Sequence, residues 1–262
     1  MPTLQAKDGC RLYYEVHGTG TPVVLIPGLG GDGRFWDGVV RDLQGHFRLI
    51  VVDHRGAGRS DRPPGPYTIE QIAADVVEVL DAEGCGQADL VGHSTGGAVV
   101  QTIALDAPAR AGKLIISGSW CRPDARFRAL FGARLALLEH KQPEIYQSLT
   151  HVFGHGAAWL AEHEDDMAAA VVSAPISLAP LEVTAARIRM LLAFDRADAI
   201  SRIDQPCLVV GSEEDILLPL YYSREIAQAI PNAALVEFGG AHFYPRERPS
   251  EFAQVLVEFL RK

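Results

Sequence analysis

The sequence predicts an α/β fold, a doubly wound and mostly parallel sheet with a helical cap inserted into it. Short apolar runs of strand length alternate with longer stretches of helical period along most of the chain. The alternation lapses between about residues 121 and 202, where Ala, Leu, Arg and His are frequent and prolines interrupt the pattern. We therefore expect a core of residues 1–120 and 203–262, with residues 121–202 as a cap above the carboxyl ends of the strands.

Eight strands and four helices are expected in the core. Six apolar runs contain few polar residues, as strands covered on both faces do: 22–27, 47–53, 88–93, 113–119, 206–211 and 233–238. A further pair of strands, 4–7 and 11–17, opens the chain with a turn at Asp8-Gly9. The helices are expected at 68–83, 95–107, 220–230 and 249–262. Thr68 with Gln71 fits a capping box, and Pro249 suits a first helical turn.

Composition narrows the class of protein. The 262 residues can bury one large core, and a formal net charge of −9 without any Lys/Arg run argues against nucleic-acid or anionic-membrane partners. The first residues are polar and no apolar run reaches the length of a membrane span, so we expect a cytoplasmic protein with no membrane partner. The four cysteines, Cys10, Cys85, Cys121 and Cys207, form no Cys-x-x-Cys pair and are predicted to be free thiols.

Gly92-His93-Ser94-Thr95-Gly96 is the most informative stretch of the chain. It lies where the expected strand 88–93 gives way to the expected helix 95–107. A serine in such a sharp turn adopts a strained backbone conformation, and the flanking glycines remove Cβ atoms that would block the approach of strand and helix. Ser94 is therefore the candidate nucleophile.

A serine hydroxyl is a poor nucleophile near neutral pH, so it needs a base and a carboxylate that orients the base. Asp215 follows the strand 206–211, and His242 follows the strand 233–238. Because each of the three residues comes directly after a strand, we expect them to converge at one edge of the sheet. The sequence thus predicts a triad of Ser94, Asp215 and His242.

Other acids compete for the carboxylate position. Asp124 follows the strand 113–119, which is a recurrent alternative in this kind of sheet. Glu213 and Glu214 are interpreted as solvated loop charges. Asp215 is preferred because it lies deepest in its loop before the next helix.

The oxyanion of a tetrahedral intermediate is stabilised best by donors that are in place before it forms. Backbone N–H groups serve this purpose. One is expected from Thr95, at the start of the helix after Ser94. The other is expected from Leu29, in the glycine-rich loop 27–31 that follows the first parallel strand.

Taken together, these motifs resemble those of α/β-hydrolase-fold serine hydrolases, over essentially all 262 residues. The run from Asp53 to Ser60 resembles the family's Asp-x-Arg-Gly-x-Gly-x-Ser loop, with Asp53 and Arg55 interpreted as braces for it. The usual His-Gly before the oxyanion residue is Pro27-Gly28 here, which leaves the backbone donor in place. The resemblance implies acyl transfer by an acyl-enzyme route, without a cofactor.

A narrower resemblance rests on the cap spacing and on two segments, 119–128 and 194–198. They are similar to those of small hydrolases of ring-degradation pathways. The groups concerned are the 3-oxoadipate enol-lactonases and the carbamate/aminoacrylate hydrolases of pyrimidine catabolism.

A dinucleotide site is considered and rejected. The run from Gly28 to Gly33 satisfies G-x-G-x-x-G, and Asp53 ends the next strand. However, Asp32 would face the pyrophosphate, and the bulky run 34–36 stands where close packing favours small residues.

A metal site is rejected as well. His151 and His155 are four apart, but Gly154 and Gly156 weaken a helix there. His163 belongs to a charged turn with the acids that follow it. We expect neither a cofactor nor a metal.

The cap suggests the substrate. The expected mouth of the pocket, within or bordering the cap, carries Arg122, Arg126, Arg128, Arg187, Arg189 and Arg196. Most are expected to be solvated or paired with neighbouring acids. An inward arginine, with Arg122 and Arg126 as first candidates, would bind a substrate carboxylate through two parallel hydrogen bonds. Trp120, Phe127 and Trp159 would supply apolar walls, so the hypothesis is a small ester, lactone or activated amide that can bear an acid group.

Two other functions remain open from sequence. One is non-hydrolytic or carbon–carbon-cleaving chemistry on the same residues, since a fold does not determine its reaction. The other is a ligand-sensing module whose catalysis is vestigial.

Overall fold

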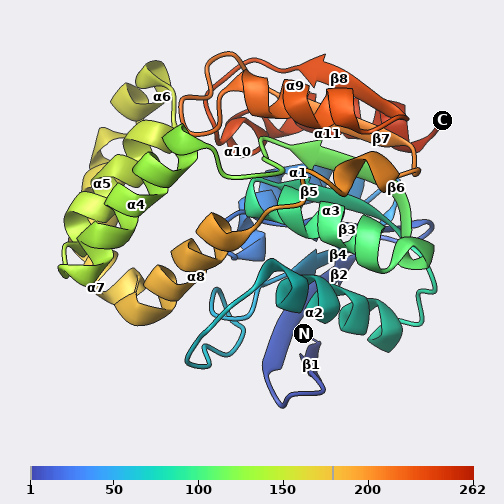
Figure 1. Ribbon diagram of the computed structural model, residues 1–262, viewed down its shortest axis with the longest axis horizontal. Helices are drawn as coiled ribbons and strands as arrows, with labels where there is room; N and C mark the ends of the chain where they lie inside the picture. Colours follow the sequence, from blue (N-terminus) through green and yellow to red (C-terminus); the bar gives the residue numbers. More distant parts are fainter. Residues whose placement is uncertain (1, 179) are drawn as a thin grey trace.

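The computed structural model describes residues 2–178 and 180–262, which form one eight-stranded sheet with helices on both faces (Figure 1). Met1 and Ala179, which the expected core and cap ranges include, lie outside the described residues. The strand order is β1-β2-β4-β3-β5-β6-β7-β8. β1 and β2 pair antiparallel to their neighbours, and the remaining pairs are parallel. The predicted fold class is therefore confirmed.

The strands match the predicted ones to within two residues at each end. They are β1 (Thr3–Gln5), β2 (Arg11–His17), β3 (Pro22–Ile26), β4 (Arg48–Val52), β5 (Ala88–His93), β6 (Ala111–Ser117), β7 (Cys207–Gly211) and β8 (Ala233–Glu237). The four predicted helices are α2 (Ile69–Ala82), α3 (Thr95–Asp106), α9 (Leu220–Ala229) and α11 (Pro249–Leu260). Thr68 caps α2, since its hydroxyl accepts a hydrogen bond from the N–H of Gln71 at 3.0 Å.

Helix α1 (Asp37–Leu43), with the short 3₁₀ turn Gly33–Trp36 before it, is an element that the sequence analysis did not anticipate. Its buried side chains share one face because they recur at helical spacing: Trp36, Val39, Val40 and Leu43. They pack on the sheet together with α11.

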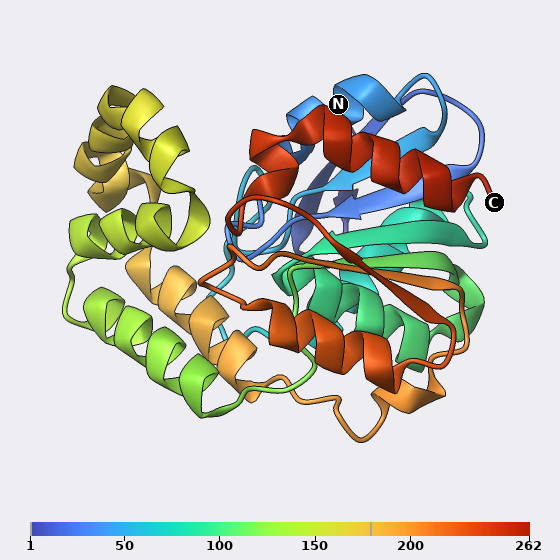
Figure 2. The ribbon, with the colours of Figure 1, turned by 90° about the horizontal axis from the view of Figure 1, so that it is seen from above.

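The core lies in two layers, one on each side of the sheet. Figure 2 shows the helices that cover the two faces of the sheet. Along β3, Val23 and Leu25 face α1 and α11, whereas Val24 and Ile26 face α2, α3 and α9. This alternation follows from the two-residue repeat of a strand. The chain goes to opposite faces after β3 and after β5, and these two strands are neighbours in the sheet. Such a topological switch point opens a crevice at the carboxyl ends of the strands.

Of the residues that the structure describes between β6 and β7, most belong to five helices, which are gathered beside the sheet, on neither of its faces (Figures 1 and 2). They are α4 (Ala125–Glu139), α5 (Pro143–Gly154), α6 (Ala157–Glu162), α7 (Glu164–Ser177) and α8 (Leu181–Ala193), and we call them the cap. Two short turns, Pro108–Arg110 and Ile200–Arg202, and α10 (Tyr244–Glu247) complete the chain. Within the described residues, no single helix is long and apolar enough to cross a membrane; α7 and α8 would qualify only jointly, and they meet at 100°.

The turn from β5 into α3 brings helix and strand unusually close together. A Cβ atom on Gly96 would overlap with the carbonyl oxygen of Ile26, and one on Gly92 would overlap with the carbonyl oxygen of Gly96. Ser94, between these glycines, has φ 55° and ψ −116°, a region that L-residues with side chains rarely adopt. The two glycines are therefore required by packing.

Gly96→Ala should lower the free energy of unfolding by about 1–3 kcal/mol or more, because overpacking outweighs the roughly 1 kcal/mol that alanine contributes to a helix. Urea denaturation checks this. Gly86→Ala is the matched control, since a Cβ on Gly86 meets nothing within 4 Å. Equal stability of the two variants would refute the packing requirement.

Candidate active site

Ser94 lies in the turn between β5 and α3, where it is the N-cap residue of α3. Its backbone is held by the end of β6. The N–H of Ser94 donates to the carbonyl oxygen of Ser117 at 2.8 Å, and the hydroxyl of Ser119 donates to the carbonyl oxygen of Ser94 at 2.8 Å. These two bonds fix the strained conformation, and they leave the Ser94 side chain on a cavity of about 730 Å³.

His242 and Asp215 form a buried pair. The Nδ1 atom of His242 lies 2.6 Å from Oδ2 of Asp215, and both residues are about 1% exposed. The other carboxylate oxygen of Asp215 accepts hydrogen bonds from the N–H groups of Leu217, at 2.9 Å, and Leu218, at 2.7 Å. The carboxylate is thus fully satisfied and holds the Nδ1 proton of His242. That leaves Nε2 as the basic nitrogen of a residue that lines the same cavity as Ser94.

The competing acids are engaged elsewhere. Asp124 caps α4 by accepting from the N–H of Phe127 at 2.8 Å, and it accepts from the hydroxyls of Tyr221 and Tyr222 at 2.5 and 2.6 Å. Glu214, interpreted above as a solvated charge, accepts from the N–H of Gly240 and so supports the loop that carries His242. Glu213 lies 3.7 Å from Arg224 on the surface.

Leu29 and Thr95, the expected oxyanion donors, come from the loop after β3 and from the start of α3. Thr95 is the first residue of α3, and the first N–H groups of a helix have no partner inside it. Leu29 lines the cavity. Its loop approaches Ser94 so closely that a Cβ on Gly28 would lie 3.3 Å from the Cβ of Ser94. The carbonyl of Leu29 accepts from Arg187 of α8 at 2.8 Å, which anchors this loop to the cap.

His93 is a member of the site that sequence reasoning missed as a functional candidate. Its ring centroid lies 4.7 Å from that of His242 and 5.1 Å from that of Phe35, against which it is stacked. Its Nδ1 atom is 3.0 Å from the hydroxyl of Ser117. Burial lowers the pKa of His93 well below its ordinary value, and the neighbouring His242 lowers it further. His93 is therefore a neutral ring packed against His242.

The five residues expected to bind substrate do not line the cavity of Ser94 in the part of the chain that the structure describes. Trp120 and Phe127 are fully buried in the core, where their rings contact each other at a centroid distance of 4.8 Å. Trp159 stacks between the rings of His155 and His163. The expectation that Trp120, Phe127 and Trp159 form the pocket walls is corrected, because these three make internal packing contacts, while the aromatic side chains that line the cavity are Phe35, Phe131, Tyr146 and Phe243.

The two arginines proposed for this role are engaged outside the cavity. Arg122 is exposed and pairs with Glu225 at 2.7 Å. Arg126 donates to the carbonyl oxygens of Ile216 and Leu217, next to Asp215. The wall of the cavity carries two other cap arginines, Arg134 and Arg187.

A sequence signal for Arg134 was present. The buried side chains of α4 are Phe127, Phe131, Arg134 and Leu138, spaced by four, three and four residues. Arg134 therefore occupies the apolar face of its helix, where an arginine requires a reason.

The rejected dinucleotide motif has a structural role. The N–H of Gly33 donates to Oδ1 of Asp53 at 2.7 Å, and Arg59 donates to the same carboxylate through both its backbone and its side chain. Arg55 is paired with Asp75 and Asp8. The interpretation of Asp53 and Arg55 as braces is confirmed.

The cap histidines are held by other contacts. His155 pairs with Glu247 at 2.6 Å, and His151 lies 3.0 Å from the side-chain amide of Gln147. His163 bonds to the carbonyl oxygen of Trp159. Among the described residues, no group of three or more His, Cys, Asp or Glu side chains is arranged to hold a metal ion. All four cysteines are buried and unpaired, as predicted.

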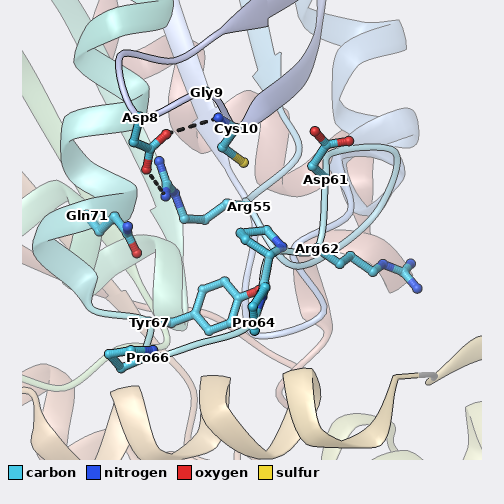
Figure 3. A pocket seen from close by; sticks show the side chains of 11 residues that line it. Asp8, Gly9, Cys10, Arg55, Asp61, Arg62, Pro64, Pro66, Tyr67 and Gln71 are labelled. Carbon is cyan, nitrogen blue, oxygen red and sulfur yellow. Dashed lines mark hydrogen bonds and ion pairs between the residues drawn. The ribbon is translucent and has the colours of Figure 1, made fainter.

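A second pocket, of about 580 Å³, opens between the β1–β2 turn and the proline-rich segment before α2 (Figure 3). Arg55 lies at its centre, but the guanidinium is fully engaged by Asp75 and Asp8. Of the described residues, only Arg62 lines both this pocket and the cavity of Ser94. The candidate catalytic residues Ser94 and His242 line the cavity of about 730 Å³, not this pocket.

The arrangement of strand, strained serine, helix and crevice defines a class of protein. Residues 23–255 match the model of the alpha/beta hydrolase family, and the chain belongs to that family. It is a hydrolase of the α/β fold.

Relatives of the chain carry hydrolase names. The protein named carbamate hydrolase RutD of Azorhizobium caulinodans is 36% identical over 264 residues, covering 99% of this chain and 98% of the relative. Its counterpart in Caulobacter vibrioides is 37% identical, covering 98% and 97%. The crystal structure of the enol-lactonase from Burkholderia xenovorans LB400 superposes with a TM-score of 0.91 at 26% identity, over the whole of both chains. The resemblance to these two groups, expected from the sequence, is confirmed.

The burial of two histidines allows a prediction of how the free energy of unfolding depends on pH. Burial lowers the pKa of His93 and of His54 well below their ordinary value of about 6.5, so both stay neutral in the folded protein but bind protons in the unfolded chain. The unfolded state then holds more protons below pH 6.5, and stability falls as the pH falls. Each group contributes up to about 1.4 kcal/mol per pH unit to that loss.

Urea denaturation between pH 7.5 and 5.5 measures this dependence. The free energy of unfolding should be flat at the upper end and decline below about pH 6.5, and His93→Gln should reduce the slope. A wild-type stability that does not change across this range would contradict the assignment of neutral buried histidines.

Proposed function

We propose that this hydrolase cleaves a small ester, lactone or activated amide through a triad of Ser94, His242 and Asp215 and an acyl-enzyme intermediate. The observation that carries the proposal is the 2.6 Å contact between His242 and a fully satisfied, buried Asp215, in a cavity that also holds the side chain of Ser94. That pair is a histidine base with a fixed tautomer.

In the first half of the reaction, Nε2 of His242 takes the proton of the Ser94 hydroxyl as its oxygen attacks the carbonyl carbon. Asp215 stabilises the imidazolium that forms. The N–H groups of Leu29 and Thr95 donate to the oxyanion of the tetrahedral intermediate. When the intermediate collapses, the proton on His242 passes to the leaving alcohol or amine, and the acyl group remains on Ser94.

In the second half, His242 takes a proton from water, and the resulting hydroxide attacks the acyl carbon. Collapse of the second intermediate returns a proton to Ser94 and releases the acid. Every proton transfer uses side chains of this chain and water, so the proposed route requires no cofactor.

The relatives support this reaction class. A carbamate and an enol-lactone both present a carbonyl carbon bonded to a heteroatom that leaves on hydrolysis. The cavity of about 730 Å³ lies within the range of small-molecule sites, which supports a small-molecule substrate. A site with a strained serine, a satisfied acid and a neutral His93 beside the base favours catalysis over a vestigial sensing role.

Substitutions of the proposed triad test the mechanism. Ser94→Ala should lower kcat for 4-nitrophenyl butyrate by on the order of 10⁴-fold or more, because the acyl-enzyme cannot form. Asp215→Asn should cost nearly as much, because the histidine loses the acceptor that fixes its tautomer.

Asp124→Asn is the matched control for the acid. Asparagine caps a helix as well as aspartate does, so α4 keeps its N-cap and kcat should stay within a few-fold of wild type. Near-full turnover in Ser94→Ala would rule out Ser94 as the nucleophile. A larger loss of kcat in Asp124→Asn than in Asp215→Asn would rule out Asp215 as the acid of the triad.

A further inference from the structure

Arg187 of α8 is a buried arginine without a counter-ion. The residue is 2% exposed, and no carboxylate in the described part of the chain lies within salt-bridge distance of its guanidinium. Burial lowers the pKa of Arg187 to about 10, so the group is still charged at neutral pH. Buried charges in proteins are paired as a rule, because an isolated one is costly. An arginine in such a place is therefore expected to serve a purpose other than stability.

The guanidinium of Arg187 bonds to two loops of the core. It donates to the carbonyl oxygen of Leu29, in the loop after β3, at 2.8 Å, and to the carbonyl oxygen of Arg55, in the loop after β4. Its Nη2 atom also lies 3.2 Å from Nδ1 of His54. A guanidinium has donors only, so Nδ1 of His54 is the acceptor and its ring is neutral. The pKa of His54, lowered by burial and by the charge of Arg187, agrees with this assignment.

The loop of Leu29 is held through three of its carbonyl oxygens. The N–H of Gly31 donates to the carbonyl of Gly28 at 2.9 Å, and the N–H of His54 donates to the carbonyl of Gly31 at 2.8 Å. The bond from Arg187 to the carbonyl of Leu29 is the third, and of these three it alone comes from the cap. Among the described residues, no acceptor is bonded to the N–H of Leu29, so this donor remains available to an oxyanion.

Glycines make this loop adaptable and also let Arg187 reach it. A Cβ on Gly30 would meet nothing within 4 Å, and Gly31 has φ 66°, so neither residue restricts the backbone by its side chain. A Cβ on Gly31 would stand 2.6 Å from Nη2 of Arg187 and would displace the guanidinium. The bond from Arg187 to the carbonyl of Leu29 opposes rotation of the peptide unit between Leu29 and Gly30. Donors of an oxyanion hole are effective only if they are in place before the charge develops.

We propose that Arg187 is a positioning residue of the oxyanion hole, which holds the carbonyl of Leu29 from the cap and thereby keeps the N–H of Leu29 in place for the oxyanion. The proposal rests on the hydrolase function proposed above and deepens it. Arg187 touches no reacting atom in this role, since it acts through the backbone of Leu29. The cap then contributes to catalysis as well as to the wall of the cavity.

Kinetics of Arg187→Met and Arg187→Lys test the proposal. Loss of one oxyanion donor costs on the order of 10²–10³-fold in kcat, so a loosened Leu29 should lower kcat for 4-nitrophenyl butyrate by roughly tenfold or more in Arg187→Met. KM should stay within a few-fold of wild type, because the loop acts on the transition state. Arg187→Lys keeps the charge and one donor and should fall between the two. Arg189→Gln, at an exposed arginine of the same helix that pairs with Glu139, is the matched control and should match wild type.

Inhibition by butylboronic acid separates positioning from a merely structural role. Its boron adds to a serine hydroxyl and becomes a tetrahedral anion, so its affinity reports on the oxyanion site without turnover. The inhibition constant should rise in Arg187→Met by about the factor by which kcat/KM falls. A variant that does not fold is recognised by its lost thermal transition, and Arg187→Lys then carries the comparison. Wild-type kinetics in Arg187→Met, or a fall of kcat/KM with unchanged boronate affinity, would overturn the proposal.

Failure of the hydrolase mechanism gives a different result. Wild type would then neither turn over the ester nor bind the boronic acid, and amide hydrogen exchange of residues 27–31 would decide the anchoring of the loop by itself. Faster exchange in Arg187→Met than in wild type and Arg189→Gln supports the anchoring. Equal exchange in the three proteins overturns it.

Discussion

The close contact between α3 and the ends of β3 and β5 is the constraint on which the rest of the site depends. Without side chains at Gly92 and Gly96, the helix begins directly on top of the sheet, and the chain must turn at Ser94 with φ 55°. Such a conformation costs on the order of 1–3 kcal/mol and persists only where the surroundings impose it. Here Ser117, at the end of β6, and Ser119, which follows it, impose the conformation, so that the serine hydroxyl faces the crevice at the switch point of the sheet.

The cap acts as a support for the site as well as a cover. The loops that carry Leu29, Asp215 and His242 are each bonded to a different cap helix. Arg187 of α8 bonds to the carbonyl of Leu29, and Arg126 of α4 bonds to the carbonyls on the chain next to Asp215. The carbonyl of Gly154, at the end of α5, accepts from the N–H of Phe243, which follows His242. A change of substrate preference through cap mutations therefore risks moving the loops that hold the reacting groups.

The core was predictable from the sequence because its inner strands, such as β3, β4, β5 and β7, are buried on both faces and therefore consist of almost continuous apolar residues. The position of Ser94 was predictable because the glycine spacing has a steric cause. Trp120 and Phe127 were wrongly expected at the pocket, since a large aromatic side chain near a site can pack in the core as readily as it can line the pocket. The roles of the cap arginines depend on how each helix is rotated about its axis and on which carbonyl oxygens lie nearby. Neither of these can be predicted from amino-acid composition. For Arg134 the helical spacing from Phe127 to Leu138 would have shown its inward position.

Ser94 as the reacting nucleophile is tested most directly by locating a covalent adduct. The protein would be treated with a fluorophosphonate at neutral pH and digested, and the peptides would be sequenced by mass spectrometry. A single phosphonyl group on Ser94, absent when the protein is unfolded before treatment, is the predicted result, because the hydroxyl reacts only when His242 and the turn activate it. An adduct on another residue, or no adduct on the folded protein, would contradict the proposed mechanism.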